Sequence, residues 1–211
     1  MLRRRAFLFL ATTAAAAAAA AFVAPALVLR ARAAEPSDAA SFVKHVGDAL
    51  VAIVNGPGSE QDKRPKLQKV VNSFVDVDEI ARFCLGRYWR VATPEQQKQY
   101  IALFHEVLLN NIAGKIGQYQ GVSFDLGRTQ KREDEDVVSS VVRRPNNPPT
   151  NVDWVISNES GGPKIIDVIA EGTSLRLTQR SDYASYLAHN NNNVQALLEA
   201  MRQQLAQKSS G

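Results

Sequence analysis

The chain has 211 residues, 45% of them hydrophobic and 22% charged, which is the balance of one globular domain and not of a disordered chain. Its formal charge is +4, but residues 1–33 hold five arginines and no acidic residue, so residues 34–211 carry 20 basic and 21 acidic side chains, a net charge of −1. The basic balance belongs to the N-terminal segment and is no argument for nucleic-acid binding.

The first 33 residues have the three-part layout of an export signal. Three arginines follow Met1-Leu2, an apolar stretch runs from Ala6 to Leu29, and Ala31-Arg32-Ala33 offers the small residues that a signal peptidase requires. We expect cleavage after Ala33, which leaves residues 34–211 as a single domain; an uncleaved anchor helix is the alternative. Arg4-Arg5 also resembles the twin-arginine signature, so Sec and twin-arginine export both stay open.

Helical spacing of apolar residues predicts that the domain begins with two helices. The first is expected over residues 41–54 and ends at the turn-forming residues 55–59. The second is expected over residues 65–74, with Pro65 in its first turn, where a missing N–H costs nothing.

Two capping-box patterns predict the next two helices. Asp76 and Glu79 start a short helix through Cys84, which Gly86 ends. Thr93 and Gln96 start a long amphipathic helix that continues to about residue 118.

The periodicity changes from helical to alternating after Gly121, which predicts strands. Short turn clusters separate the apolar runs and leave no room for crossover helices, so the sheet should be antiparallel. The four expected strands lie near residues 122–126, 137–142, 152–156 and 165–170.

Helical spacing returns over residues 181–189 and 194–207, with a break at Asn190–Asn193. The order predicts an α+β domain, with N-terminal helices, a curved four-stranded antiparallel sheet and C-terminal helices, the helices packed on one face. The apolar side chains between sheet and helices either fill a core or line a cavity, and periodicity alone leaves both open.

The sequence contains no recognisable set of catalytic or metal-binding residues. Cys84 is the only cysteine, which excludes an intramolecular disulfide and a cysteine-based zinc site. His45, His105 and His189 share no metal-ligand spacing, and nucleophile-elbow, P-loop and dinucleotide-binding motifs do not occur. We therefore expect no catalysis, no cofactor and no metal.

Two separated segments resemble the MlaC family, also called toluene-tolerance proteins. The first is VDVDEIARFCLGRYWRVATPEQ at residues 75–96. The second is IDVIAEGTSL at residues 166–175, followed by QRSDY at residues 179–183. Asn190–Asn193 departs from the family, which has a glycine-containing turn at this position.

The resemblance implies a lipid carrier of the Gram-negative periplasm, which holds phospholipid acyl chains in an apolar cavity between sheet and helices. Its expected partners are an outer-membrane lipoprotein complex and an inner-membrane transporter of the ABC type, between which it would carry lipid and so support outer-membrane lipid asymmetry. A related branch is associated with hopanoids, so a hopanoid-associated lipid-binding protein is an alternative.

Alternation in the strands and apolar spacing in the helices indicate which residues would line such a cavity. We call this set of candidate ligand-binding residues the predicted wall. Strict alternation would separate Val168 from Ile165 and Ile169, but all three are included because the register of that strand is open. From the helices the wall takes Phe83, Tyr88, Phe104, Leu108 and Ile112, and from the sheet Val138, Val142, Trp154, Ile156, Ile165, Val168 and Ile169.

Two further interpretations come from other classes of protein. A small α+β-cone enzyme acting on an apolar substrate would need a buried carboxylate or histidine at the cavity floor. Asp153 and Asp167 are the carboxylate candidates, although alternation predicts that Asp153 faces outward and the register around Asp167 is open. An accessory factor that binds only proteins would have a filled core. A carrier needs neither a catalytic group nor a filled core, since it only has to bury acyl chains.

Overall fold

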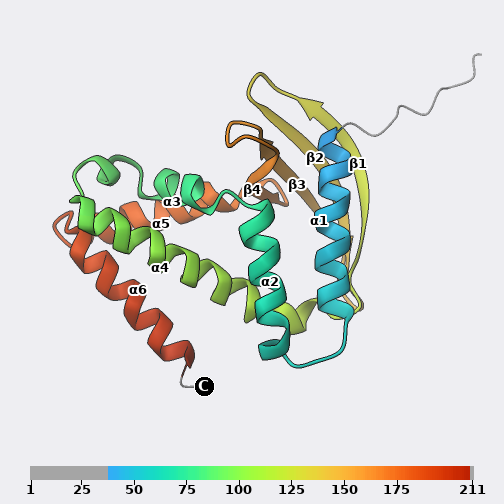
Figure 1. The fold of residues 1–211 in the computed structure, drawn as a ribbon, viewed down its shortest axis with the longest axis horizontal. Coiled ribbons are helices and arrows are strands. Elements are labelled where there is room, and N and C mark those ends of the chain that lie inside the picture. The colour runs from blue at the N-terminus through green and yellow to red at the C-terminus, as the bar shows by residue number, and fades with distance from the viewer. Residues whose placement is uncertain (1–37, 210–211) are drawn as a thin grey trace, which may run out of the picture. The chain divides into compact units, whose positions relative to one another are not determined.

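The computed structural model describes residues 38–209, so the export signal predicted in residues 1–33 lies outside the described residues. Within them the chain forms helices, then an antiparallel sheet, then two more helices, in the order that the sequence predicted (Figure 1). None of the described helices is long and apolar enough to cross a membrane.

The first two helices are α1, Asp38–Asn55, and α2, Glu60–Phe74. Helix α2 begins five residues before the predicted start, because Ser59 and Asp62 form a capping box in which each side chain accepts the other's backbone N–H, at 3.3 and 2.8 Å. The prediction that Pro65 lies in the first turn is therefore wrong. Pro65 lies inside the helix, where it removes one backbone hydrogen bond.

Helix α3, Val77–Leu85, leads through the 3₁₀ turn η1, Gly86–Arg90, to α4, Pro94–Ala113, and the 3₁₀ turn η2, Ile116–Tyr119. Both predicted helix starts are confirmed. In α3, however, the capping box is incomplete. The Asp76 side chain accepts the Glu79 backbone N–H, but the Asp76 backbone N–H donates to the carbonyl of Ile165 at 3.0 Å and not to the Glu79 side chain. The cap thus ties the helix start to the sheet.

The sheet is an antiparallel meander whose strands pair in chain order: β1 Ser123–Lys131, β2 Glu135–Arg143, β3 Thr150–Ser157, β4 Lys164–Ala170 and the short β5 Thr173–Ser174. The four predicted strands are confirmed, and β5 adds a fifth. The first two strands are longer than predicted, because residues 129–131 pair with residues 136–138 in the β1–β2 hairpin. Register shifts in the β1–β2 and β3–β4 pairs accompany the curvature of the sheet in Figure 1.

Two helices complete the domain: α5, Leu175–His189, and α6, Val194–Ser209. Helix α5 begins six residues before the predicted start because Ser174 accepts the backbone N–H of Leu177. In the turn before α6, Asn191 and Asn192 have φ values of 53° and 56°, a left-handed conformation that asparagine tolerates better than most residues. This explains how asparagines replace the glycine-containing turn.

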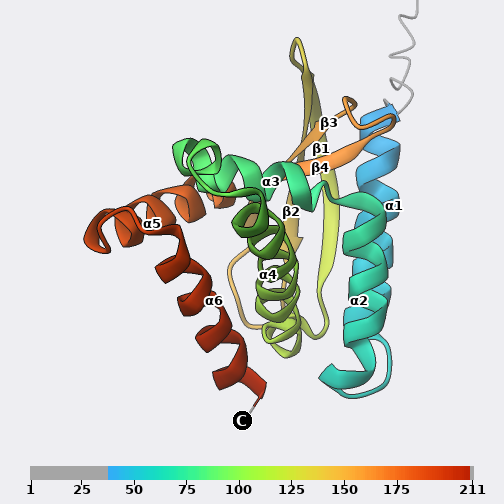
Figure 2. The same cartoon turned by 60° about the vertical axis from the view of Figure 1, so that its left-hand side comes forward.

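The two faces of the sheet have different partners. Helices α1 and α2 cover the front face, which bears Val138, Trp154 and Ile165 (Figures 1 and 2). The rear face bears Val137, Val155 and Ile166, and the start of α5 contacts it through Asp167 and Glu135.

The remaining helices form an apolar cluster beside the sheet, which we call the helical core. Its buried residues come mainly from α3 to α6 and include Ala81, Tyr100, Leu187 and Leu198. A smaller basal cluster joins the end of α1, the middle of α2 and the end of α4 around Leu67. The domain therefore has two main apolar regions, one under the front face and one in the helical core.

Arg176, at the start of α5, links three elements electrostatically. Its guanidinium lies 3.1 Å from a Glu135 oxygen in β2, 3.6 Å from an Asp167 oxygen in β4 and 3.8 Å from a Glu79 oxygen in α3. Asp167 also accepts hydrogen bonds from the Ser174 hydroxyl and the Arg176 backbone N–H. These residues fix the corner where β4, β5 and α5 meet, so the second family segment serves the fold.

Helix α1 approaches β1 closely at Gly47. A Cβ at this position would lie 2.2 Å from Cζ of Phe124, so only glycine fits while the ring keeps its place. We expect Gly47→Ala to lower the free energy of unfolding by about 1–3 kcal/mol, because the clash outweighs the better helix propensity of alanine. Chemical denaturation measures this. Gly162→Ala is the control, since its Cβ would meet nothing within 4 Å and unchanged stability is expected.

Three carboxylates surround the single positive charge of Arg176, and Glu79 is the most distant of them. Burial raises the pKa of Glu79 above its usual value, Asp76 adds to the shift, and Arg176 opposes it. A raised pKa means that the folded state binds the proton more tightly than the unfolded state, so stability falls as pH rises from about 4.5 through the folded-state pKa.

We therefore expect Glu79→Gln to be more stable than the wild type at pH 7, by at most about 1 kcal/mol because the carboxylate is partly exposed. The difference should vanish as pH falls below about 4.5, where Glu79 is protonated in both states. Urea denaturation across pH 3.5–8 tests this, with exposed Glu199→Gln as the control. A destabilised Glu79→Gln at pH 7 would mean that attraction to Arg176 exceeds the cost of burial.

Candidate functional site

The five helical residues of the predicted wall all lie in or against the helical core. Tyr88 and Phe104 are buried there, and partly buried Phe83, Leu108 and Ile112 pack against them. Helix α4 supplies three of the five, in keeping with the amphipathic pattern that predicted it.

Six of the seven sheet residues of the predicted wall lie on the front face. The β3–β4 pairing explains why Ile165 and Val168 share this face against strict alternation. Trp154 pairs with Val168 and Ile156 pairs with Ile165, so one residue on β3 stands opposite two on β4. Ile169 is the exception: it packs beside Val155 and Ile166 on the rear face, apart from the rest of the predicted wall.

The structure thus places the predicted wall in two apolar groups, one on the front face and one in the helical core. They meet along a seam marked by Val75 and Ile112. Val75, between α2 and α3, packs against both groups, and Ile112 joins the helical core to the basal cluster, which Val142 of the front face also touches. Val75 escaped the sequence analysis because it lies in a short connection with no periodicity of its own.

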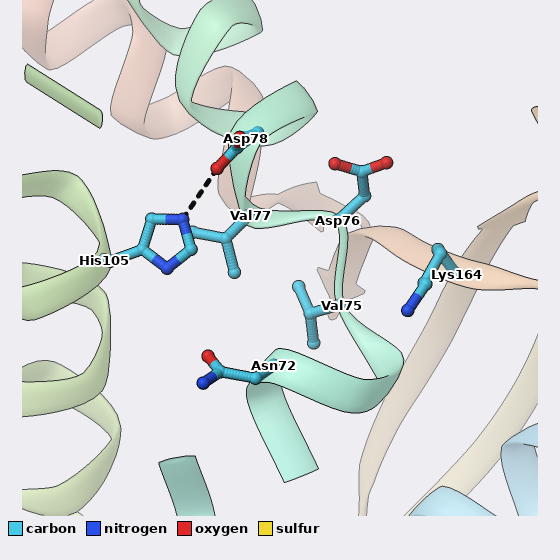
Figure 3. Close-up of a pocket in the computed structure, with 7 residues that line it drawn as sticks. All are labelled: Asn72, Val75, Asp76, Val77, Asp78, His105 and Lys164. Atoms are coloured by element: carbon cyan, nitrogen blue, oxygen red, sulfur yellow. Dashed lines mark hydrogen bonds and ion pairs between the residues drawn. The ribbon is translucent and has the colours of Figure 1, made fainter. Parts of the chain in front are cut away.

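A concave pocket of about 330 Å³ lies over this seam (Figure 3). Side chains from the end of α2, the start of α3, α4 and the start of β4 line it: Asn72, Val75, Asp76, Val77, Asp78, His105 and Lys164. A smaller pocket of about 70 Å³ between α2 and α4 shares Asn72 and His105 with it. The volume of the larger one is at the lower end of the range for ligand-binding pockets.

The rim of the larger pocket is polar. His105 Nε2 and Asp78 Oδ1 are 2.7 Å apart, and because a carboxylate only accepts at neutral pH, the histidine N–H is the donor. The Lys164 ammonium donates to the Ser73 carbonyl at 2.6 Å. Asp76 accepts from the Glu79 backbone N–H and the Ser160 hydroxyl.

The first family segment acts mainly through packing and backbone geometry. The Tyr88 hydroxyl donates to Asn192 at 2.7 Å, which fixes η1 to the turn before α6. Gly86 has a φ of 58°, and a Cβ on it would lie 3.1 Å from Nε of Arg180, a residue of the second segment. The two segments that are far apart in the sequence therefore contact one another.

The surroundings of Cys84, His45 and His189 indicate structural roles for these three titratable residues. Burial raises the pKa of the Cys84 thiol to about 12, which keeps it protonated and unreactive. His45 stacks edge-on against Phe74, with ring centroids 5.4 Å apart, and His189 lies 2.7 Å from the Ser185 carbonyl.

The two carboxylates considered for an enzyme do not line the pocket. Asp153 pairs with Ser139 and Ile169 on the rear face of the sheet. Asp167 is buried, and its oxygens accept from the Val168 and Arg176 backbone N–H groups and from Ser174. Its position is that of a structural anchor for the β4–α5 corner.

Comparison with known proteins agrees with this geometry. The fold is similar to that of a phospholipid-binding protein from Ralstonia solanacearum, whose structure was solved in complex with a phospholipid. The TM-score is 0.73 at 23% sequence identity, over 82% of this chain and 99% of that one. The family model described as MlaC protein matches residues 44–203, most of the described domain. The chain therefore belongs to the MlaC family.

Proposed function

We propose that this protein is a carrier that binds a phospholipid with its acyl chains between the front face of the sheet and the helical core. The observation that carries the proposal is the arrangement of the predicted wall, in which two separate apolar groups meet along the seam at Val75 and Ile112. The phospholipid held by the similar Ralstonia protein supports the same choice of ligand.

Binding on this proposal requires the two apolar groups to separate. The described residues leave pockets of about 330 and 70 Å³ at the seam, and Val138 and Ile156 are fully buried against α1. Each methylene moved from water into the apolar interior contributes about 0.8 kcal/mol, so an entering acyl chain compensates for the packing that the two groups give up as they separate. A carrier needs this balance, because the same chains must leave again for a membrane.

Membership of the MlaC family supports a more specific role. We propose that residues 1–33 direct export to the periplasm, by either the Sec or the twin-arginine route. There the carrier would pass phospholipid between an outer-membrane lipoprotein complex and an inner-membrane ABC-type transporter. Such transfer involves no covalent step, and the carrier would act as a binding protein and not as an enzyme.

Native mass spectrometry of the protein, expressed from its full-length coding sequence in a Gram-negative host, tests both proposals. We expect a chain that begins at Ala34, with one bound phospholipid carrying two acyl chains. A protein that contains no lipid and takes none from phospholipid vesicles would disprove the function. A bound polycyclic lipid in place of a phospholipid would favour the hopanoid alternative.

A matched pair of substitutions on α4 adds a control to this experiment. Ile112 touches the helical core and the basal cluster, whereas Ile101 touches the helical core alone, and both are partly buried. Ile112→Gln should lower lipid occupancy severalfold, because its amide would face an acyl chain without a hydrogen-bond partner, at a cost of about 1–3 kcal/mol. Ile101→Gln should retain the lipid, and circular dichroism checks that both variants fold.

Fluorescence quenching locates the acyl chains. The chain has two tryptophans: Trp154 lies on the front face and in the predicted wall, and Trp89 packs against Tyr100 in the helical core. Phospholipid brominated on its acyl chains should quench Trp154 in the Trp89→Phe variant more strongly than Trp89 in the Trp154→Phe variant. Equal quenching, or stronger quenching of Trp89, would contradict the proposed position of the chains.

A further inference from the structure

The polar pocket over the seam contains groups of both charges, which decides what it can hold. Lys164 carries a positive charge, Asp76 and Asp78 carry negative charges, and Asn72 offers a neutral amide. A purely anionic ligand would face two carboxylates, and a purely cationic one would face the ammonium of Lys164. The set fits a ligand with one charge of each sign.

Figure 3 shows how these groups are arranged around the space. Lys164 extends into it from the β4 side, and the Asp78–His105 pair lies across from it, between α3 and α4. Val75 and Val77 form the apolar floor between them. The Lys164 ammonium and the Asp78 carboxylate are thus on opposite sides of an apolar base.

Two of the three charged groups, Lys164 and Asp78, keep bonding capacity for a ligand. An ammonium group has three donors, and the bond from Lys164 to the Ser73 carbonyl uses one of them. Asp78 is exposed and bonds His105 through Oδ1, which holds the carboxylate in place while it remains accessible as an acceptor. Asp76 caps α3 and is occupied with the fold.

The floor connects this pocket to the proposed acyl-chain site. Val75 packs against both the helical core and the front-face group, so it lies where the two groups would separate. A lipid whose chains pass between these groups would leave its head group at the polar rim above Val75.

We infer that this pocket binds a zwitterionic lipid head group, a phosphodiester that bears a primary ammonium. Lys164 and the Asn72 amide donate to the phosphate oxygens, and Asp78, oriented by His105, accepts from the ammonium. This inference rests on the proposed function, and it adds a preference for ethanolamine-type over anionic glycerol-type phospholipids.

The test incubates the protein exported by the Gram-negative host with vesicles of equal parts phosphatidylethanolamine and phosphatidylglycerol and measures the two lipids bound to it by mass spectrometry. Wild-type protein should carry phosphatidylethanolamine in about two- to fivefold excess, the range expected for a partly exposed charge pair. Asp78→Asn should remove this excess without lowering total uptake. Lys164→Gln should lower uptake of both lipids by a similar factor, since both contain the phosphate.

Lys44 and Asp48 form an exposed ion pair on α1, outside the pocket, and supply matched controls. Lys44→Gln and Asp48→Asn should leave both the ratio and the uptake at wild-type values. If the wild type and Asp78→Asn both bind the lipids in the vesicle ratio, the head-group inference is overturned and the proposed function stands. If the wild type takes up neither lipid, the proposed function fails as well.

A final experiment tests whether the pocket binds the head group of a lipid or a free solute with the same chemical groups. Glycerophosphoethanolamine, titrated calorimetrically to millimolar concentration, should bind too weakly to displace lipid, because it lacks acyl chains. Submicromolar binding of this compound, abolished in Asp78→Asn, would identify a small-molecule site and overturn the lipid assignment.

Discussion

The connection between α2 and α3 joins the sheet to the helical core. There the Asp76 backbone N–H donates to the Ile165 carbonyl at 3.0 Å, while Val75 forms an isolated parallel bridge with Ile165. The edge of β4 is thereby covered, and the start of α3 is fixed to the sheet. Val75 can pack against the front-face group and the helical core at once because the backbone on both sides of it is fixed.

The residues of the two family segments mostly maintain this arrangement. Asp76 caps α3, Tyr88 bonds the turn before α6, and Asp167 organises the corner that presents Arg176 to its carboxylate partners. These roles require particular polar groups at particular positions, which is why the segments form a recognisable pattern in the linear sequence. Their hydrogen bonds are directed within the protein, so the family pattern identifies a scaffold.

A lipid carrier functions through the apolar surface that binds its ligand and not through reactive groups. The apolar surfaces that would receive acyl chains also stabilise the domain when they contact one another along the seam. On the proposed function, contacts with acyl chains would replace this packing, and each buried methylene would contribute about 0.8 kcal/mol. The polar pocket lies above Val75, where a charged group can remain hydrated.

Local patterns were sufficient for the elements of the fold. The capping box at Thr93, the alternation in β1 and β3 and the helical spacing of α1 and α4 were all readable, because each depends on neighbours within a few residues. The starts of α2 and α5 were placed too late. The first turn of α2 is polar, and the leucines in the first turn of α5, Leu175 and Leu177, are exposed and lie outside the apolar pattern of the helix.

The sequence alone determined an α+β domain with an antiparallel sheet and enough apolar side chains either to fill a core or to line a cavity. The tertiary structure decided which residues face one another. In the β3–β4 pair one residue stands opposite two, which puts Val168 on the front face and Ile169 on the rear face. Periodicity cannot predict this, because a shift of one residue inverts the face of every later side chain. The tertiary structure also brought Asp78, His105 and Lys164 around one pocket from three separate elements, since only packing sets their distance.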